Sequence, residues 1–250
     1  MLDAGAAVHL FDARSHSIVV LPPPDRGPIV LALKHASADS LPLNQHRTVT
    51  MADTLRRLLE WKGYDVETVP RVDVKSVIEV CGPDDLLCKL LVAPVKVRRV
   101  MLISEFRRWG PCRPGTLQDL TEHGLTDADV RLGWLMAGHY RQVRRFWACS
   151  PLGYLDDARV TRRRMVRRAG RLDPLPAVPT EAAAVRLLRP YTPGFRALAN
   201  VDAALSTDLH TPRAIAALHL ALRTPELTAH DRRVLLSAAH RLLGLPLETG

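Results

Sequence analysis

Residues 53–66 read DTLRRLLEWKGYDV, and this stretch decides the fold predicted for the N-terminal half of the chain. Its apolar residues recur at helical spacing, and Gly63 supplies a stop for the helix. A β-branched strand follows at 66–69, and the stretch 29–33 upstream is continuously apolar, as in a strand covered on both faces. With a polar loop expected before Met51, the order strand, loop, helix, glycine, strand is one βαβ unit. It predicts a parallel α/β layer.

Outside this unit, the pattern predicts further strands up to about residue 103 and only helices from Thr116 onward. Two short β-branched runs, 8–11 and 18–21, flank a polar turn and predict a hairpin, and a further strand is expected at 95–103. From Thr116 onward the apolar periodicity is helical throughout. The predicted helices cover 117–123, 130–140, 155–172, 182–188, 195–205, 212–222 and 231–243. A small α/β domain followed by an α-helical domain is therefore expected, with the proline-rich piece 173–179 dividing the last helices from those before them.

Composition limits the classes of function. The 250 residues are 47% hydrophobic, enough to bury a core, and 35 Lys and Arg against 26 Asp and Glu give a net charge of +9. This charge suggests a polyanionic partner, although a GC-rich coding bias is the first explanation of the thirty arginines. Only five cations are lysines, none beyond Lys96, which excludes any mechanism that needs a lysine in the second half.

Cysteine usage and hydropathy indicate a compartment. The four cysteines form no C-x-x-C pair, which is typical of a reducing cytoplasm. No stretch approaches the roughly 18 uncharged apolar residues of a membrane span. We therefore expect a cytoplasmic protein without a membrane partner.

Five segments, in order along the chain, resemble the family of cysteinyl-tRNA synthetases and their shorter relatives, the mycothiol cysteine ligases. They are HLFD at 9–12, RT at 47–48 with residues 53–66, TLQDL at 116–120, AGHYR at 137–141 and NVDAALSTDLHTPRA at 200–214. The resemblance implies an α/β fold: a Rossmann-like class I synthetase domain with a small parallel sheet, followed by an α-helical bundle. The domains it implies are 1–115 without the usual inserted domain, a helical junction at 116–172, and the bundle at 173–250.

Working members of that family activate cysteine with ATP, and their first ATP motif is His-x-Gly-His. Counting back from Arg47 places this motif on four residues without a histidine or a glycine, namely Pro42, Leu43, Asn44 and Gln45. A slip of one residue would return a single imidazole, that of His46. Otherwise His35 and His46 are expected to be ordinary loop histidines. The charge stabilisation that the family's imidazoles supply is therefore expected to be lost.

The second ATP motif of the family is a lysine-rich loop that holds the leaving pyrophosphate. Its positions here are Phe106, Arg107, Arg108, Trp109 and Gly110. Arginine does not replace the compact lysine charge, so this motif is also degenerate. Arg107 and Arg108 are read either as a remaining anion site or as two solvated arginines beside a tryptophan.

The resemblance also implies a zinc site that selects cysteine, made of two cysteines, a histidine and a glutamate. Cys81 and Cys88 lie in the shortened stretch where the zinc-bearing insertion would be, but no histidine stands between Glu79 and Glu105. We expect no zinc and two reduced, partly buried cysteines.

One arginine-rich segment invites a functional reading. Seven arginines between 159 and 171 recur three and four residues apart on a predicted helix, and Arg141, Arg144 and Arg145 precede them. They indicate either a face that follows a phosphate backbone or a solvated, charge-rich helix surface. The candidates for RNA binding are Arg163, Arg164, Arg167 and Arg168.

Two functions follow. The first is a paralogue of cysteinyl-tRNA synthetase with eroded ATP and zinc sites, which acts without catalysis and without a cofactor by binding tRNA, another RNA, or a protein that covers its exposed sheet surface. The second is a repurposed ATP-dependent, amino-acid-activating ligase of specialised metabolism. Its candidate nucleotide-binding residues are Asp39, His46, Arg47, Arg107 and Arg108. A working cysteinyl-tRNA synthetase is not expected, because three sets of residues would all need replacements.

Overall fold

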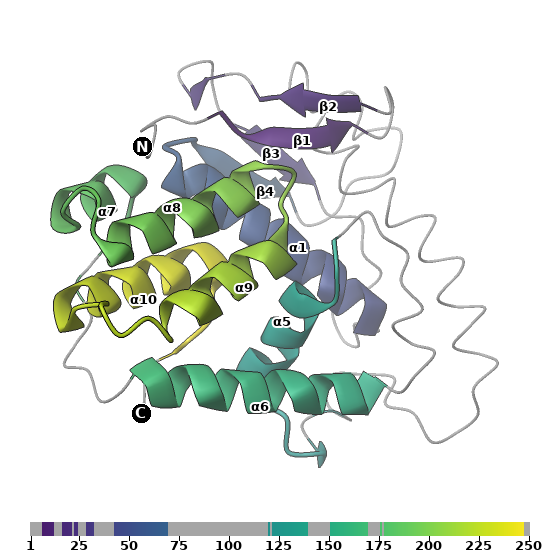
Figure 1. Cartoon of the computed structure of the whole chain (residues 1–250). Helices are drawn as coiled ribbons and strands as arrows, with labels where there is room; N and C mark the ends of the chain where they lie inside the picture. Colours follow the sequence, from purple (N-terminus) through teal and green to yellow (C-terminus); the bar gives the residue numbers. More distant parts are fainter. Residues whose placement is uncertain are drawn as a thin grey trace.

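The computed structural model describes residues 7–12, 17–21, 23–24, 29–32, 43–69, 120, 122–139, 151–169, 176 and 178–247. Within these residues, four strands precede or flank one long helix, and six helices follow; Figure 1 shows their arrangement. In order, the named elements within this part are β1 (His9–Asp12), β2 (Ser17–Val20), β3 (Ile29–Ala32), α1 (Leu43–Trp61), β4 (Val66–Val69), α5 (Asp127–Met136), α6 (Pro151–Ala169), α7 (Glu181–Leu187), α8 (Pro193–Ser206), α9 (Thr211–Ala221) and α10 (Ala229–Leu243).

The predicted hairpin is confirmed. Strands β1 and β2 pair antiparallel, with His9 opposite Val20 and Asp12 opposite Ser17. The backbone of β1 also touches the turn after α8, because the amide of Asp208 donates to the carbonyl of His9 at 2.7 Å. The hairpin is therefore tied to the helical part of the chain.

The predicted βαβ unit is also confirmed. Strands β3 and β4 pair in parallel, with Ile29 opposite Val66 and Ala32 opposite Val69, and α1 connects them. This two-stranded pair is the part of the predicted parallel layer that lies within the described residues. The strand predicted at 95–103 lies outside them, and a larger Rossmann-type sheet stays a prediction.

Helix α1 is longer than the apolar pattern predicts. It begins at Leu43, so the loop predicted before Met51 is wrong for its last part, and His46 is a helical residue and not a loop histidine. The reason is that no proline or glycine stands between Pro42 and Gly63, so nothing in 43–50 stops a helix even though that turn is polar. The predicted stop at Gly63 is confirmed by its φ of +87°.

The predicted helices of the second half form with shifted ends. Threonine fixes several of the starts: the hydroxyls of Thr126, Thr180, Thr192 and Thr228 each accept a hydrogen bond from a backbone amide in the first turn. Helix α6 begins at Pro151, four residues before the predicted start, since proline suits a first helical position. The predicted helix at 117–123 lies mostly outside the described residues.

The helices share one apolar core with the βαβ unit. Helix α8 packs on α9 and α10, α5 packs on α6, and α1 packs on both α10 and α5. Trp61 of α1 and Trp134 of α5 are buried completely between these elements. Within the described residues, no helix combines the length and the apolar character that crossing a membrane needs.

Candidate nucleic-acid interface

Helix α6 carries the arginines that the sequence singles out, and it forms the lower edge of the molecule in Figure 1. Its buried side, which includes Leu155 and Met165, packs toward α5. The two helices approach closely because α5 has a glycine at the crossing: a Cβ on Gly133 would overlap Cδ2 of Leu155. The position of α6 is therefore fixed by its apolar face, which leaves the other face outward.

Two of the α6 arginines are paired, one with the neighbouring helix and one within α6. Arg162 donates to the carboxylate of Asp129 on α5 at 2.6 Å, and Arg159 pairs with Asp156 of its own helix at 2.7 Å. Asp129 is buried, which by itself raises its pKa, but the hydrogen bonds from Arg162 and Thr126 outweigh this and lower it. The stripe predicted from spacing is therefore narrower than expected, because these two arginines are held by carboxylates.

Three arginines form the outward face of α6. Arg163, Arg164 and Arg167 are exposed, and Arg163 and Arg167 stand four residues apart on the same side of the helix. No ion pair joins any of the three to a carboxylate within the described residues, whereas Arg159 and Arg162 each have one. We call Arg163, Arg164 and Arg167 the α6 arginine face. It presents positive charge to solvent.

The fourth predicted arginine, Arg168, turns toward α9. It is half-buried, and its guanidinium Nη1 contacts Nε2 of His219. Burial lowers the pKa of His219, and the charges of Arg168, Arg223 and Arg164 lower it further. No local pattern points to His219, because Arg168 is 51 residues away along the chain.

A second cluster joins two of the segments that carry the family resemblance. His139, from the AGHYR segment, lies 2.8 Å from the carbonyl oxygen of Asp208 and 3.3 Å from its carboxylate, so Nε2 donates. Its ring meets that of His210 edge to face, with centroids 5.1 Å apart. Asp208 and Leu209 both have positive φ, at 59° and 47°. These contacts hold residues 137–139 and the 200–214 segment together around one tight turn.

The turn that follows α1 is joined to the helical part by buried charges. Lys62 lies 2.7 Å from Asp202 of α8 and 3.0 Å from Glu181 of α7, and the side chains of the three are only 3%, 4% and 8% exposed. This ion triad locks the helix of the βαβ unit to two helices of the bundle.

A second ion network lies further back on α1. Asp53 pairs at 2.7 Å with Arg56 and Arg57 of the same helix and with Arg131 of α5. Burial raises the pKa of Asp53, but the hydrogen bonds of Arg57 and Arg56 and the charge of Arg131 outweigh it and bring the pKa to about 2. Arg131 also donates to the carbonyl oxygen of Leu243, so this network ties α1, α5 and the end of α10 together.

Helices α8 and α9 also border a groove of about 670 Å³. Its lining combines small apolar side chains, such as Ala197 and Ala217, with the guanidinium groups of Arg196 and Arg213 and the carboxylate of Glu226. The groove therefore offers apolar contact next to charges of both signs.

The predicted nucleotide and metal positions are mostly outside the described residues. Asp39, Pro42, Cys81, Cys88 and the run Phe106, Arg107, Arg108, Trp109 and Gly110 all lie there. Leu43, Asn44, Gln45, His46 and Arg47 lie in the first turns of α1, and only their backbone is described. In the described part of the chain, no three histidine, cysteine or acidic side chains gather as metal ligands would.

Two curated proteins are similar to part of this chain. They are the L-cysteine:1D-myo-inositol 2-amino-2-deoxy-alpha-D-glucopyranoside ligases of Mycobacterium ulcerans (strain Agy99) and Mycobacterium marinum (strain ATCC BAA-535 / M), each 38% identical over 132 residues. The match spans 51% of this chain and only 27% of each ligase. No protein-family model matches the chain. The similarity supports the predicted relationship to cysteine ligases of the synthetase type, over half of the chain.

Proposed function

We propose that this chain works by binding RNA, on a scaffold similar to that of the cysteine ligases, and that it does so without catalysis. One observation carries the proposal: three arginines of α6 face solvent with no carboxylate partner in the described residues, while their neighbours Arg159 and Arg162 are paired. No acidic residue stands three or four positions from any of the three along the sequence, so α6 itself offers them no partner. The α6 arginine face is therefore suited to an external anion.

The chemistry of the side chains favours phosphate as that anion. A guanidinium group is always charged and offers planar pairs of N–H donors that match the oxygens of a phosphate. Arginines that follow one another along an outward helix face meet successive phosphates of a nucleic-acid strand, and each contact releases condensed counterions. The net charge of +9 adds long-range attraction for a polyanion.

The partial similarity to cysteine ligases supports a scaffold of synthetase type, and the eroded motifs support the loss of its chemistry. The positions of the first motif, Pro42 to Gln45, hold no histidine, and those of the second hold no lysine. We propose that the domains of this chain follow that scaffold, with boundaries at 115 and 172. Among RNAs, tRNA is the first to test. The other partner class is a protein that covers the sheet. Binding of such a partner should not change when the arginines of α6 are replaced.

Salt dependence tests the RNA proposal. Fluorescence anisotropy with labelled tRNA, measured at several potassium chloride concentrations, should show log Kd rising with log salt by about 2–3 for three phosphate contacts. An affinity that does not change with salt, or no binding at low salt, contradicts the proposal. An unlabelled DNA duplex as competitor shows how far the binding depends on RNA.

The second candidate is the repurposed ligase, and the 38% identity to cysteine ligases is the observation that favours it. Asp39, His46, Arg47, Arg107 and Arg108 are then the residues for the nucleotide. ATP–pyrophosphate exchange with a panel of amino acids, together with a thermal shift with ATP, separates the two candidates. We expect neither exchange nor a shift. Robust exchange with cysteine would overturn the non-catalytic proposal, and an R107Q/R108Q variant would then lose that exchange.

A further inference from the structure

We propose that the groove between α8 and α9 is the contact surface of a symmetric dimer, with a second copy of this chain as its occupant. The inference goes beyond the proposed function and does not rest on RNA binding. Three features of the groove carry it: a floor of small side chains, one exposed leucine, and charges of opposite sign at its two ends.

The groove follows two helices that run in opposite directions. Helices α8 and α9 lie side by side, and the short turn at 207–210 reverses the chain between them (Figure 1). The lining runs from Pro193 to Ala203 on α8 and from Arg213 to Thr224 on α9. Much of the floor is alanine, namely Ala197, Ala203, Ala216, Ala217 and Ala221. A side chain from outside therefore finds room close to both helices.

Leu220 is an apolar side chain that this chain leaves uncovered. It lines the groove from α9 and is 66% exposed, whereas Leu218 and Leu222 of the same stretch are buried. Burying a leucine is favourable, and in packed helix pairs such a side chain enters the space between residues of the facing helix. The groove therefore carries both the projecting side chain and the small-residue floor that a second copy needs.

The charges at the two ends match across a two-fold axis. Arg213 stands in the first turn of α9, and Glu226 lines the groove at the other end, just beyond Thr224. Both are exposed, and within the described part of the chain no ion pair joins either to another side chain. A rise of 1.5 Å per residue puts these ends roughly 16 Å apart, too far to pair within one chain. Between two copies in antiparallel contact, Arg213 of each lies at Glu226 of the other.

The same axis places the leucine on an alanine. An axis that exchanges the positions of Arg213 and Thr224 also exchanges those of Leu220 and Ala217, because each pair has the same midpoint along α9. Leu220 of one copy then packs on Ala217 of the other. One register satisfies charge and shape together. A two-fold interface uses the same patch twice, so this agreement favours a second copy over an unrelated partner.

The dipole of α9 explains why Arg213 needs an external carboxylate. Arg213 stands at the positive end of this helix, and the first turn holds no acidic residue. A cation there is unfavourable in the isolated chain, and Glu226 of a second copy relieves it. Arg196, in the first turn of α8, lies at the Glu226 end as well. It does not exclude Arg213 of the other copy, because a carboxylate has acceptor sites for two guanidinium groups.

Sedimentation velocity of the full chain tests the dimer. We expect the mass to rise from one chain to two between about 1 and 100 µM, as for a small interface. A chain that stays monomeric over this range contradicts the proposal and leaves the groove to a peptide or another protein.

A matched pair of leucine variants locates the interface. L220Q should raise the dimer Kd about tenfold or more, because it removes the apolar contact at the centre of the interface. L187Q changes a leucine of α7 that is 37% exposed and lies outside the groove, and it should leave the Kd unchanged. Equal Kd values for the two variants would contradict the proposal.

Charge reversal tests the two-fold pairing. R213E and E226R each place like charges at both ends of a dimer, so each variant alone should dimerise about tenfold or more weakly. In a mixture of the two variants, both ends of the mixed dimer join unlike charges, and the Kd should return close to the wild-type value. Recovery on mixing also shows that both variants are folded. A mixture as weak as the single variants overturns the pairing of Arg213 with Glu226, and so do wild-type Kd values for the single variants.

Discussion

Replacing Lys62 with methionine lowers the free energy of unfolding by about 3–5 kcal/mol, the cost of removing one partner from a buried ion pair. The ammonium group is nearly inaccessible and lies 2.7 Å from Asp202 and 3.0 Å from Glu181. Methionine fills a similar volume but carries no charge. Two carboxylates that are less than a tenth exposed then face each other without the cation between them.

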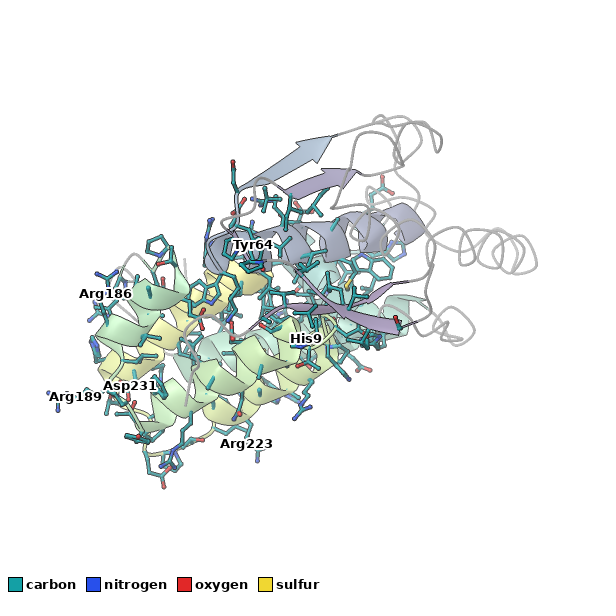
Figure 2. All side chains as sticks on the ribbon, turned by 90° about the horizontal axis from the view of Figure 1, so that it is seen from above. His9, Tyr64, Arg186, Arg189, Arg223 and Asp231 are labelled. Carbon is teal, nitrogen blue, oxygen red and sulfur yellow. The ribbon has the colours of Figure 1, made fainter. Side chains whose placement is uncertain are left out.

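Urea unfolding followed by circular dichroism measures this loss. Two further variants test whether the loss of stability comes from the ion triad. Lys62→Met combined with Glu181→Gln and Asp202→Asn removes the repulsion and should recover a large part of the stability. Arg186→Met removes a cation from the exposed end of α7, labelled in Figure 2, and should change stability by less than about 0.5 kcal/mol. A loss below about 1 kcal/mol for Lys62→Met would show that the triad does not form.

Gly194→Ala has the second large effect, a loss of about 1–3 kcal/mol from overpacking. Gly194 stands in the first turn of α8, and a Cβ there would lie 2.5 Å from Cβ and 2.9 Å from Cγ of Asp231. Both atoms are close to the backbone of α10, so no flexible side chain can move aside. The helices must shift apart, even though alanine alone favours helix over glycine.

The same substitution at Gly153 should do the opposite. Gly153 lies in α6, and a Cβ there meets no atom within 4 Å. Gly153→Ala should therefore raise the free energy of unfolding by about 0.5–1 kcal/mol, the difference in helix propensity. If α8 and α10 approach as closely as described, thermal and urea unfolding should show changes of opposite sign in the free energy of unfolding for Gly194→Ala and Gly153→Ala. A stabilising Gly194→Ala would contradict that approach.

Local patterns predict the elements of this fold well. The order strand, helix, glycine, strand around Gly63 predicts β3, α1 and β4, because each of these elements is encoded by a pattern of a few neighbouring residues. The start of α1 was not predicted, because the polar stretch 43–50 looks like a loop. Without a proline or glycine to interrupt it, such a polar stretch can still be helical. Lys62 escapes for another reason. Its partner Asp202 lies 140 residues away, and nothing local distinguishes it from a surface lysine.

The candidate site was also predicted only in part. The sequence predicts an outward arginine face on α6, and Arg163, Arg164 and Arg167 are indeed exposed. It does not predict that Arg162 is held by Asp129, 33 residues away. Spacing along a helix shows which side chains share a face, but the pairing of that face depends on the neighbouring helix.

The central claim is that the α6 arginine face carries RNA binding, and one comparison of variants tests it most directly. R163A/R164A/R167A removes the face, and R186A/R189A/R196A removes three exposed arginines from α7, α8 and the turn between them, with the same change in net charge. The dependence of tRNA affinity on salt is measured for both. Removal of the face should lower the salt slope by about 2–3. The control triple should keep the wild-type slope. Equal slopes for the two triples would contradict the claim, because net charge and not the α6 arginine face would then govern binding.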